Sequence, residues 1–267
     1  EHNRHDKVKL AKQWGGTGII ARNKISYYAR GRGTDSKGLA RWTWARYQGI
    51  QDQHFRFVSI YQPCKNTSGH MAVYAQHRET LQDNNDDREP RQAFLEDLKT
   101  ALIEWLDTGD HIVVGGDVNE SVLHPSIVDL FTECGLTNLI FDMHGSDGAP
   151  RSYYNTSEGR VVDGLWGTPG VEVVQCGYLE PGDFPGNHSL LWADITYNSV
   201  LGHNPPFPHV PAARRLKLHD SKVTKRYLKE YEKLISQHNL RARQFRLEAS
   251  TTYGTPLTGG QTLEANA

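Results

Sequence analysis

The sequence is poor in cysteine and has no long apolar run. Its 267 residues include three cysteines, an odd number at wide spacings: Cys64, Cys134 and Cys176. This pattern argues against a disulfide framework and a Cys-x-x-Cys metal site, and it fits a reducing, intracellular compartment. No stretch has the roughly 20 apolar residues that cross a bilayer, and no signal peptide is recognisable, so we expect no membrane partner.

The N-terminus lacks two further features. The first ten residues, EHNRHDKVKL, contain neither an initiator methionine nor an apolar run that could form a first strand. We therefore expect a trimmed chain in which the first strands of the domain are missing.

The remaining composition is that of a folded protein with an uneven charge distribution. Hydrophobic residues make up 37% of the chain and six are tryptophan, which is enough for a real core. The net charge is −1, but residues 209–248 hold eleven basic and four acidic residues, a net charge of +7. The rest of the chain therefore carries −8, which suggests a polyanionic partner for the tail and cation binding in the body.

Hydrophobic periodicity predicts strands interspersed with helices. Period-two patterns indicate strands, and spacings of three and four indicate helices. We expect paired strands within 15–29, strands at 39–48, 54–63, 111–115, 137–141, 151–154, 160–166, 171–178 and 188–197, and helices at 91–107, 125–134 and 223–240. The elements do not alternate strictly, so mixed sheets with helices outside are expected.

Four prolines within residues 202–211 mark a domain boundary. We expect a catalytic-type domain over 1–198, a proline-rich linker over 199–213, a basic helical segment over 214–248 and a disordered tail over 249–267.

The stretch VVGGDVNES at 113–121 places Asp117 and Asn119 at the end of a buried strand. Residues at such strand ends often face a ligand crevice. Both are also ordinary turn residues, because Asp and Asn side chains bond to their own backbone.

Three other strands carry single polar residues of the same kind. Tyr61 ends the strand FVSIYQP, Asp163 lies inside RVVDGLWGT, and His188 precedes the last apolar strand. Taken singly, each has a structural explanation as a sheet-edge tyrosine, a satisfied acid or a surface histidine.

Together these motifs resemble the endonuclease/exonuclease/phosphatase superfamily, which includes DNase I and the apurinic/apyrimidinic endonucleases. The order matches: GGTGI at 15–19, a strand-end Tyr before Pro, GGDVN, an apolar strand with an internal Asp, and Asn-His before a final strand. The resemblance covers about residues 14–197. It implies an α/β four-layer sandwich of two mixed β-sheets flanked by helices, to which the C-terminal basic helix is added.

The resemblance also implies roles for these residues in phosphodiester hydrolysis. His188 matches the general base and Asp163 the acid behind it. Asp117 matches the acid that orients the attacking water. Asn119 matches the amide that holds either that acid or the phosphate, and Tyr61 matches the phenol that hydrogen-bonds the phosphate near the leaving group. Since oxygen ligands dominate, the expected cofactor is Mg²⁺ or Mn²⁺.

Two positions depart from the family pattern. The family has Asp-His where this chain has Asn187 and His188, and the lost charge should weaken cation binding. The family also has a metal-binding Glu in an early strand, for which Glu1 is the candidate here. Asn187 and Glu1 are therefore the expected metal ligands of the chain itself.

Residues 213–240 resemble the segment that links endonuclease to reverse transcriptase in non-long-terminal-repeat retroelements. A solvated basic helix is the alternative explanation. The leading hypothesis is a retroelement-type DNA endonuclease, nuclear in that case, with DNA as partner and RNA as a second candidate for the basic tail. The alternatives are an inositol-phosphate or lipid phosphatase and an inactive nucleic-acid-binding or scaffold remnant.

Overall fold

The structure is a computed structural model that describes residues 15–65, 72–146, 151–154, 160–180, 182–183, 186–204 and 219–252. Contacts divide the chain into two units, Glu1–Pro205 and Pro206–Ala267. None of the described helices combines the length and the hydropathy that a bilayer span requires.

The first unit contains a six-stranded mixed sheet in the order β1-β2-β3-β4-β6-β5. Neighbours pair antiparallel except β3 and β4, which are parallel. The strands are β1 (Ala29–Thr34), β2 (Trp42–Gln48), β3 (His54–Tyr61), β4 (His111–Asp117), β5 (Thr137–Asn138) and β6 (Asp163–Gly167).

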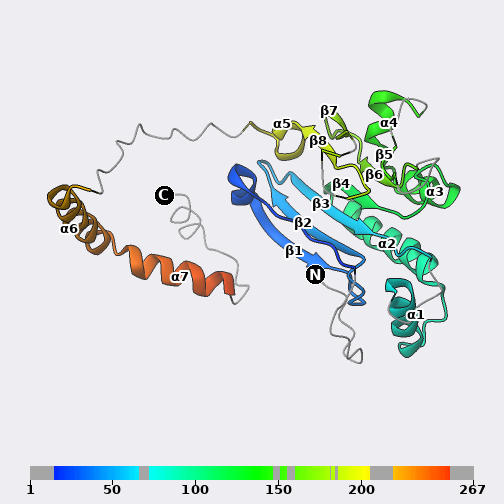
Figure 1. The fold of residues 1–267 in the computed structure, drawn as a ribbon, viewed down its shortest axis with the longest axis horizontal. Coiled ribbons are helices and arrows are strands. Elements are labelled where there is room, and N and C mark those ends of the chain that lie inside the picture. Colours follow the sequence, from blue (N-terminus) through cyan, green and yellow to red (C-terminus); the bar gives the residue numbers. More distant parts are fainter. Residues whose placement is uncertain are drawn as a thin grey trace. The chain divides into compact units, whose positions relative to one another are not determined.

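Within its described residues, the first unit also contains a second sheet and five α-helices (Figure 1). The antiparallel pair β7 (Val173–Tyr178) and β8 (Leu191–Ile195) forms the second sheet. The helices are α1 (Val73–Asp83), α2 (Pro90–Asp107), α3 (Pro125–Glu133), α4 (Leu139–His144) and α5 (Tyr197–Leu201). The expected α/β class, two sheets flanked by helices, is confirmed, although the smaller sheet is antiparallel rather than mixed.

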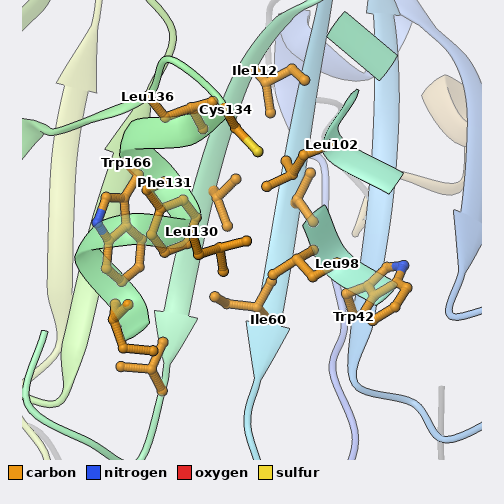
Figure 2. Packing of buried hydrophobic residues seen from close by; sticks show 14 of the residues in the cluster. Trp42, Ile60, Leu98, Leu102, Ile112, Leu130, Phe131, Cys134, Leu136 and Trp166 are labelled. Carbon is orange, nitrogen blue, oxygen red and sulfur yellow. The ribbon is translucent and has the colours of Figure 1, made fainter. Parts of the chain in front are cut away.

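Alternating side chains on the central strands supply two separate cores. Ile112 and Val114 face helices α2 and α3, whereas Val113 between them faces the other way, toward β7 and α5. Figure 2 shows Leu98 and Leu102 of α2 and Phe131 of α3 packed against the strands. The sheet is therefore covered on both faces, as a near-continuous apolar strand requires.

The parallel pair β3·β4 needs a crossover, and helices α1 and α2 provide it. Pro90 lies in the first turn of α2, where its missing N–H costs nothing. Glu89 caps the helix by accepting hydrogen bonds from the backbone N–H groups of Arg91 and Gln92. This crossover places the ends of β3 and β4 side by side.

A buried ion pair fastens the start of β2 to the helical layer. The Arg41 guanidinium donates to both carboxylate oxygens of Asp35 at 2.5 and 2.9 Å and to Asp97 of α2 at 2.9 Å. Arg41 and Asp35 side chains have no exposed surface. Burial alone would raise the pKa of Asp97, but hydrogen bonds from Arg41 and Arg88 outweigh it and lower that pKa.

His77 of α1 is a buried histidine that will make stability depend on pH. It is 1% exposed, and neither ring nitrogen is hydrogen-bonded within the described residues. Burial, and then the charge of Arg41, lower its pKa to about 4, against a smaller opposite effect of Asp35. Below pH about 6.5 the unfolded chain binds a proton here that the folded chain refuses until pH about 4.

Stability is therefore expected to fall as the pH drops from about 6.5 to 4, with His77 contributing about 3 kcal/mol of that loss. His77→Leu should flatten this part of the pH profile, and His54→Leu at a strand end should not. Urea unfolding of the three proteins at pH 7 and 4.5 measures the effect. Equal losses in wild type and His77→Leu would show that His77 is not responsible.

Three expected strand regions are wrong: 15–29, 137–141 and 151–154, the last of which contains only isolated bridges at Tyr153. Residues 15–29 form no strand pair: a 3-10 helix spans Asn23–Tyr28, and the strand β1 follows it. Asn23 has a φ of +57° but begins this helix instead of a hairpin turn. Likewise, the strand expected at 137–141 stops after two residues, because Asn138 caps α4 by accepting from the N–H groups of Ile140 and Phe141.

The second unit contains α6 (Ser221–Gln237) and α7 (Leu240–Thr252). The basic helix expected there is present as α6, and Asp220 caps it. Two boundary expectations need correction. Helix α5 ends at Leu201, inside the expected linker, where Gly202 takes the left-handed conformation of a helix C-cap. Helix α7 continues to Thr252, inside the expected disordered tail, since each added residue gains one backbone hydrogen bond.

Candidate active site

Three of the expected site residues lie in one row across the large sheet. In the register of β3, β4 and β6, Tyr61 pairs with Asp117, and Asp117 pairs with Asp163. Paired residues on neighbouring strands project from the same face. The pairing of β4 with β6 thus brings together two carboxylates, Asp117 and Asp163, that are 46 residues apart in the sequence.

Gly116 allows the end of β4 to lie close to β3. Its φ is +154°, and a Cβ there would stand 2.0 Å from the Ile60 carbonyl oxygen. The following residues turn back sharply, with Asn119 at a φ of +46°. Asn119 donates its backbone N–H to Asp117 Oδ1 (2.7 Å) and its amide to Asp117 Oδ2 (3.0 Å) and the Gln62 carbonyl (2.8 Å). Asp117 and Asn119 are therefore turn residues that bond to each other, and their role as site residues stays a prediction.

Gly116→Ala is expected to cost about 3 kcal/mol or more, because the methyl group meets backbone and the φ is unfavourable. The neighbouring Gly115→Ala is the matched control: its Cβ would be 3.1 Å from the movable Leu165 Cδ1, so a cost near 1 kcal/mol or less is expected. Urea unfolding compares the two variants. Equal costs would mean that the approach of β4 to Ile60 is not a constraint.

His188 and Asp163 form a hydrogen-bonded pair. His188 Nδ1 lies 2.9 Å from Asp163 Oδ2, and the carboxylate acceptor fixes the tautomer in which Nδ1 carries the proton. Nε2 is then the nitrogen with a free electron pair. The His188 side chain is 36% exposed and Asp163 only 14% exposed, so the imidazole stands between a buried acid and solvent.

The pKa values of Asp117 and Tyr61 are raised at this edge of the sheet. Burial and the negative charge of Asp163 raise the pKa of Asp117 to about 6, against smaller opposite effects of the Asn119 N–H, His188 and Arg91. Burial and the charge of Asp117 also raise the pKa of Tyr61, so its phenol stays protonated and can donate a hydrogen bond. Negative charge at this site therefore exceeds what the neighbouring cations compensate.

The donor set fits a divalent cation of the magnesium type. Ligand atoms of Asp117, Asp163 and His188 all lie within 4.8 Å of one another. Mg²⁺ and Mn²⁺ are commonly held by one or two carboxylates and water, and a cation would offset the charge that raises the pKa of Asp117. Since His188 Nδ1 is hydrogen-bonded to Asp163, the two carboxylates are the groups that would hold such a cation, and Nε2 of His188 keeps its free electron pair.

Three supporting residues were not identified from the sequence. The Ser152 hydroxyl accepts from the backbone N–H groups of Val162 and Asp163 at 2.9 and 3.0 Å. The Tyr153 ring lies 4.8 Å from that of His188, and its backbone forms an isolated bridge with His188 instead of the strand expected at 151–154. The Tyr178 hydroxyl donates to the Asp163 carbonyl at 2.6 Å. Nothing in the local pattern of a single sequence marks these contacts, because each joins separate segments.

Neither of the two expected metal ligands is tested by the structure. Glu1 lies outside the described residues, so its role stays a prediction. Asn187 is exposed beside His188, and its backbone carbonyl accepts from the Tyr154 N–H at 2.9 Å. Its role as a ligand also stays a prediction.

A cavity of about 320 Å³ opens beside the His188–Asp163 pair. Asp163, His188 and Ser189 line its polar side, and Phe57, Leu165 and Leu191 its apolar side. A larger hollow of about 550 Å³ lies in the second unit between α6 and α7, lined by residues such as Ile235, Asn239 and Arg241. Because Asp163 and His188 line the smaller cavity and ligand atoms of Asp117 lie within 4.8 Å of theirs, it is the candidate active site.

No family model and no curated protein match this chain. Similar solved structures include the catalytic domain of human Nocturnin with bound sulfate (14% identity, TM-score 0.40, 58% of this chain and 53% of that chain). An endonuclease/exonuclease/phosphatase family protein from Bacteroides thetaiotaomicron (12%, 0.38, 58% and 54%) and the 3′ phosphatase NExo from Neisseria bound to a product DNA hairpin (14%, 0.40, 58% and 65%) are also similar. The chain spans only about half to two thirds of the length of these proteins. At such low identities and TM-scores, these likenesses assign no role to any residue of this chain.

Proposed function

We propose that the chain is a metal-dependent phosphodiester hydrolase, and more specifically a DNA endonuclease of the retroelement type. The observation that carries the proposal is the junction of the His188–Asp163 pair with the Asp117–Asn119 pair at one edge of the sheet. A base backed by a buried acid, next to a second acid held by an amide, supplies the groups that hydrolysis of a phosphate ester needs.

In this proposal His188 Nε2 removes a proton from the attacking water as its oxygen bonds to phosphorus. Asp163 keeps the imidazole in the correct tautomer and stabilises the imidazolium that forms. Asp117, held by Asn119, orients the water, and the protonated Tyr61 donates to the phosphate. The bond to the leaving oxygen then breaks, that oxygen takes up a proton from solvent, and DNA is left with a 3′-hydroxyl. A divalent cation, when bound, supplies positive charge for the phosphate oxygens.

Two features favour a nucleic acid as substrate. The basic second unit complements a polyanion, and residues 213–240 are similar to the segment that follows retroelement endonucleases. Hydrolysis of inositol phosphates or lipids would use the same chemistry, but binding of these substrates would depend less on an extended basic helix.

Nicking of supercoiled plasmid tests the proposal. We expect nicked circles with Mg²⁺ or Mn²⁺ and none with EDTA. A parallel reaction measures phosphate release from inositol phosphates and phosphoinositides. Phosphate release without nicking would contradict the substrate class, and the lack of both activities would identify an inactive binding or scaffold protein.

A further inference from the structure

The cations of α6 form a single straight stripe. Five basic residues on this helix are exposed: Lys222, Lys225, Arg226, Lys229 and Lys233. At 100° per residue they fall within an arc of about 100°, and at 1.5 Å per residue they extend over about 16 Å of the helix axis. We name these five residues the basic stripe.

The other faces of α6 limit what the basic stripe can bind. An apolar face that includes Val223, Tyr227, Tyr231 and Leu234 lies opposite, with these side chains 40–49% exposed. Glu230 and Glu232 fall about 80° to either side of the centre of the stripe, which is where the apolar and polar faces meet. Lys233 lies 4.0 Å from Glu230, and a pair so exposed contributes little.

This arrangement disfavours an anionic membrane surface. A helix that lies in the membrane interface inserts its apolar face, so the borders of that face meet the headgroups. On α6 the two glutamates occupy those borders and would face anionic headgroups, whereas the basic stripe would point into water. The charges therefore suit a soluble polyanion that contacts the stripe from the side opposite the apolar face.

The straightness of the stripe selects among polyanions. A flexible single strand can follow a straight row of cations for its whole length. A strand of B-form duplex completes a turn in about 34–36 Å, so over about 16 Å it winds nearly halfway round the duplex and away from a straight row. We infer that the basic stripe of α6 is a binding track for the phosphate backbone of single-stranded nucleic acid.

The inference predicts a defined salt dependence for the 267-residue chain. Each phosphate contact to a single strand contributes about −0.7 to the slope of log K against log salt. Five contacts give about −3.5, so affinity should fall about a hundredfold between 50 and 200 mM salt. Fluorescence anisotropy with a labelled twelve-nucleotide dT or rU strand, in EDTA to prevent any hydrolysis, measures this slope. Equal affinity for dT and rU is expected, because the contacts are to phosphates.

Matched double variants separate the stripe from net charge. Lys225→Gln with Lys229→Gln should reduce the slope by about 1.4 and lower the affinity at 50 mM salt at least tenfold. Arg241→Gln with Arg246→Gln removes the same charge from α7 and should change the slope by less than about 0.5. Gln has nearly the helix propensity of Lys, and circular dichroism checks that helix content is unchanged.

Three results would overturn the inference. Equal losses in the two double variants would show that net charge, and not the stripe, controls binding. Equal or tighter binding of a twelve-base-pair duplex would contradict the single-strand assignment. Binding to vesicles containing phosphatidylserine that depends on Lys225 and Lys229 would identify a membrane surface instead. Because these measurements need no metal and no hydrolysis, they can fail while the proposed nuclease activity stands, and the reverse.

Discussion

His188→Ala is expected to lower plasmid nicking by a factor of about 10² to 10⁴, the usual effect of removing a general base. The loss should appear in the turnover rate, since the acids that would hold the cation and the phenol of Tyr61 remain. His188 is 36% exposed at its side chain, so the substitution should leave the unfolding midpoint nearly unchanged. A loss of activity would therefore report on chemistry and not on folding.

The matched control is His54→Ala, at the other end of β3 from Tyr61, which should retain wild-type activity. Nicking rates under single-turnover conditions and urea unfolding of all three proteins complete the test. If His188→Ala keeps more than half of the wild-type rate, His188 is not the base, and the proposed role of Asp163 behind it loses its support.

Arg41→Met is expected to destabilise the first unit by about 3–5 kcal/mol, because it leaves Asp35 charged and buried without its partner. Asp97 also loses a hydrogen bond from Arg41, although Arg88 still holds it at 2.9 Å. The backbone N–H of Tyr61 donates to the Arg41 carbonyl, so the start of β2 and the site end of β3 are joined here. Urea unfolding at pH 7 measures the loss.

Two controls identify the cause of the stability loss in Arg41→Met. Arg41→Met combined with Asp35→Asn removes both charges and should recover at least half of the lost stability. Lys99→Met breaks an exposed pair with Glu133 and should leave the stability nearly unchanged. If the double variant is as unstable as Arg41→Met alone, the loss comes from packing of the arginine stem and not from a stranded charge.

The strands and helices with strong periodicity could be predicted from the sequence. The strands expected at 54–63 and 111–115 and the helix expected at 91–107 are present as β3, β4 and α2. Strand β1 (Ala29–Thr34) could not be predicted, because its sequence ARGRGT lacks an apolar pattern. Its glycines serve a tertiary purpose: a Cβ on Gly33 would stand 2.6 Å from the Trp44 ring of the neighbouring strand.

The features of the candidate site also divide into those that could be predicted from the sequence and those that only the tertiary structure shows. The sequence by itself was enough to select the candidate site residues, because the order of Tyr61, Asp117, Asn119, Asp163 and His188 along the chain is readable in its motifs. The tertiary structure alone decided that Ser152 supports the backbone of Asp163, that Tyr153 packs on His188 and that Asp163 lies close enough to raise the pKa of Asp117 to about 6. Local patterns encode which face of an element is buried. Hydrogen bonds and charge interactions between segments 10 to 46 residues apart depend on strand register, which only the packed sheet fixes.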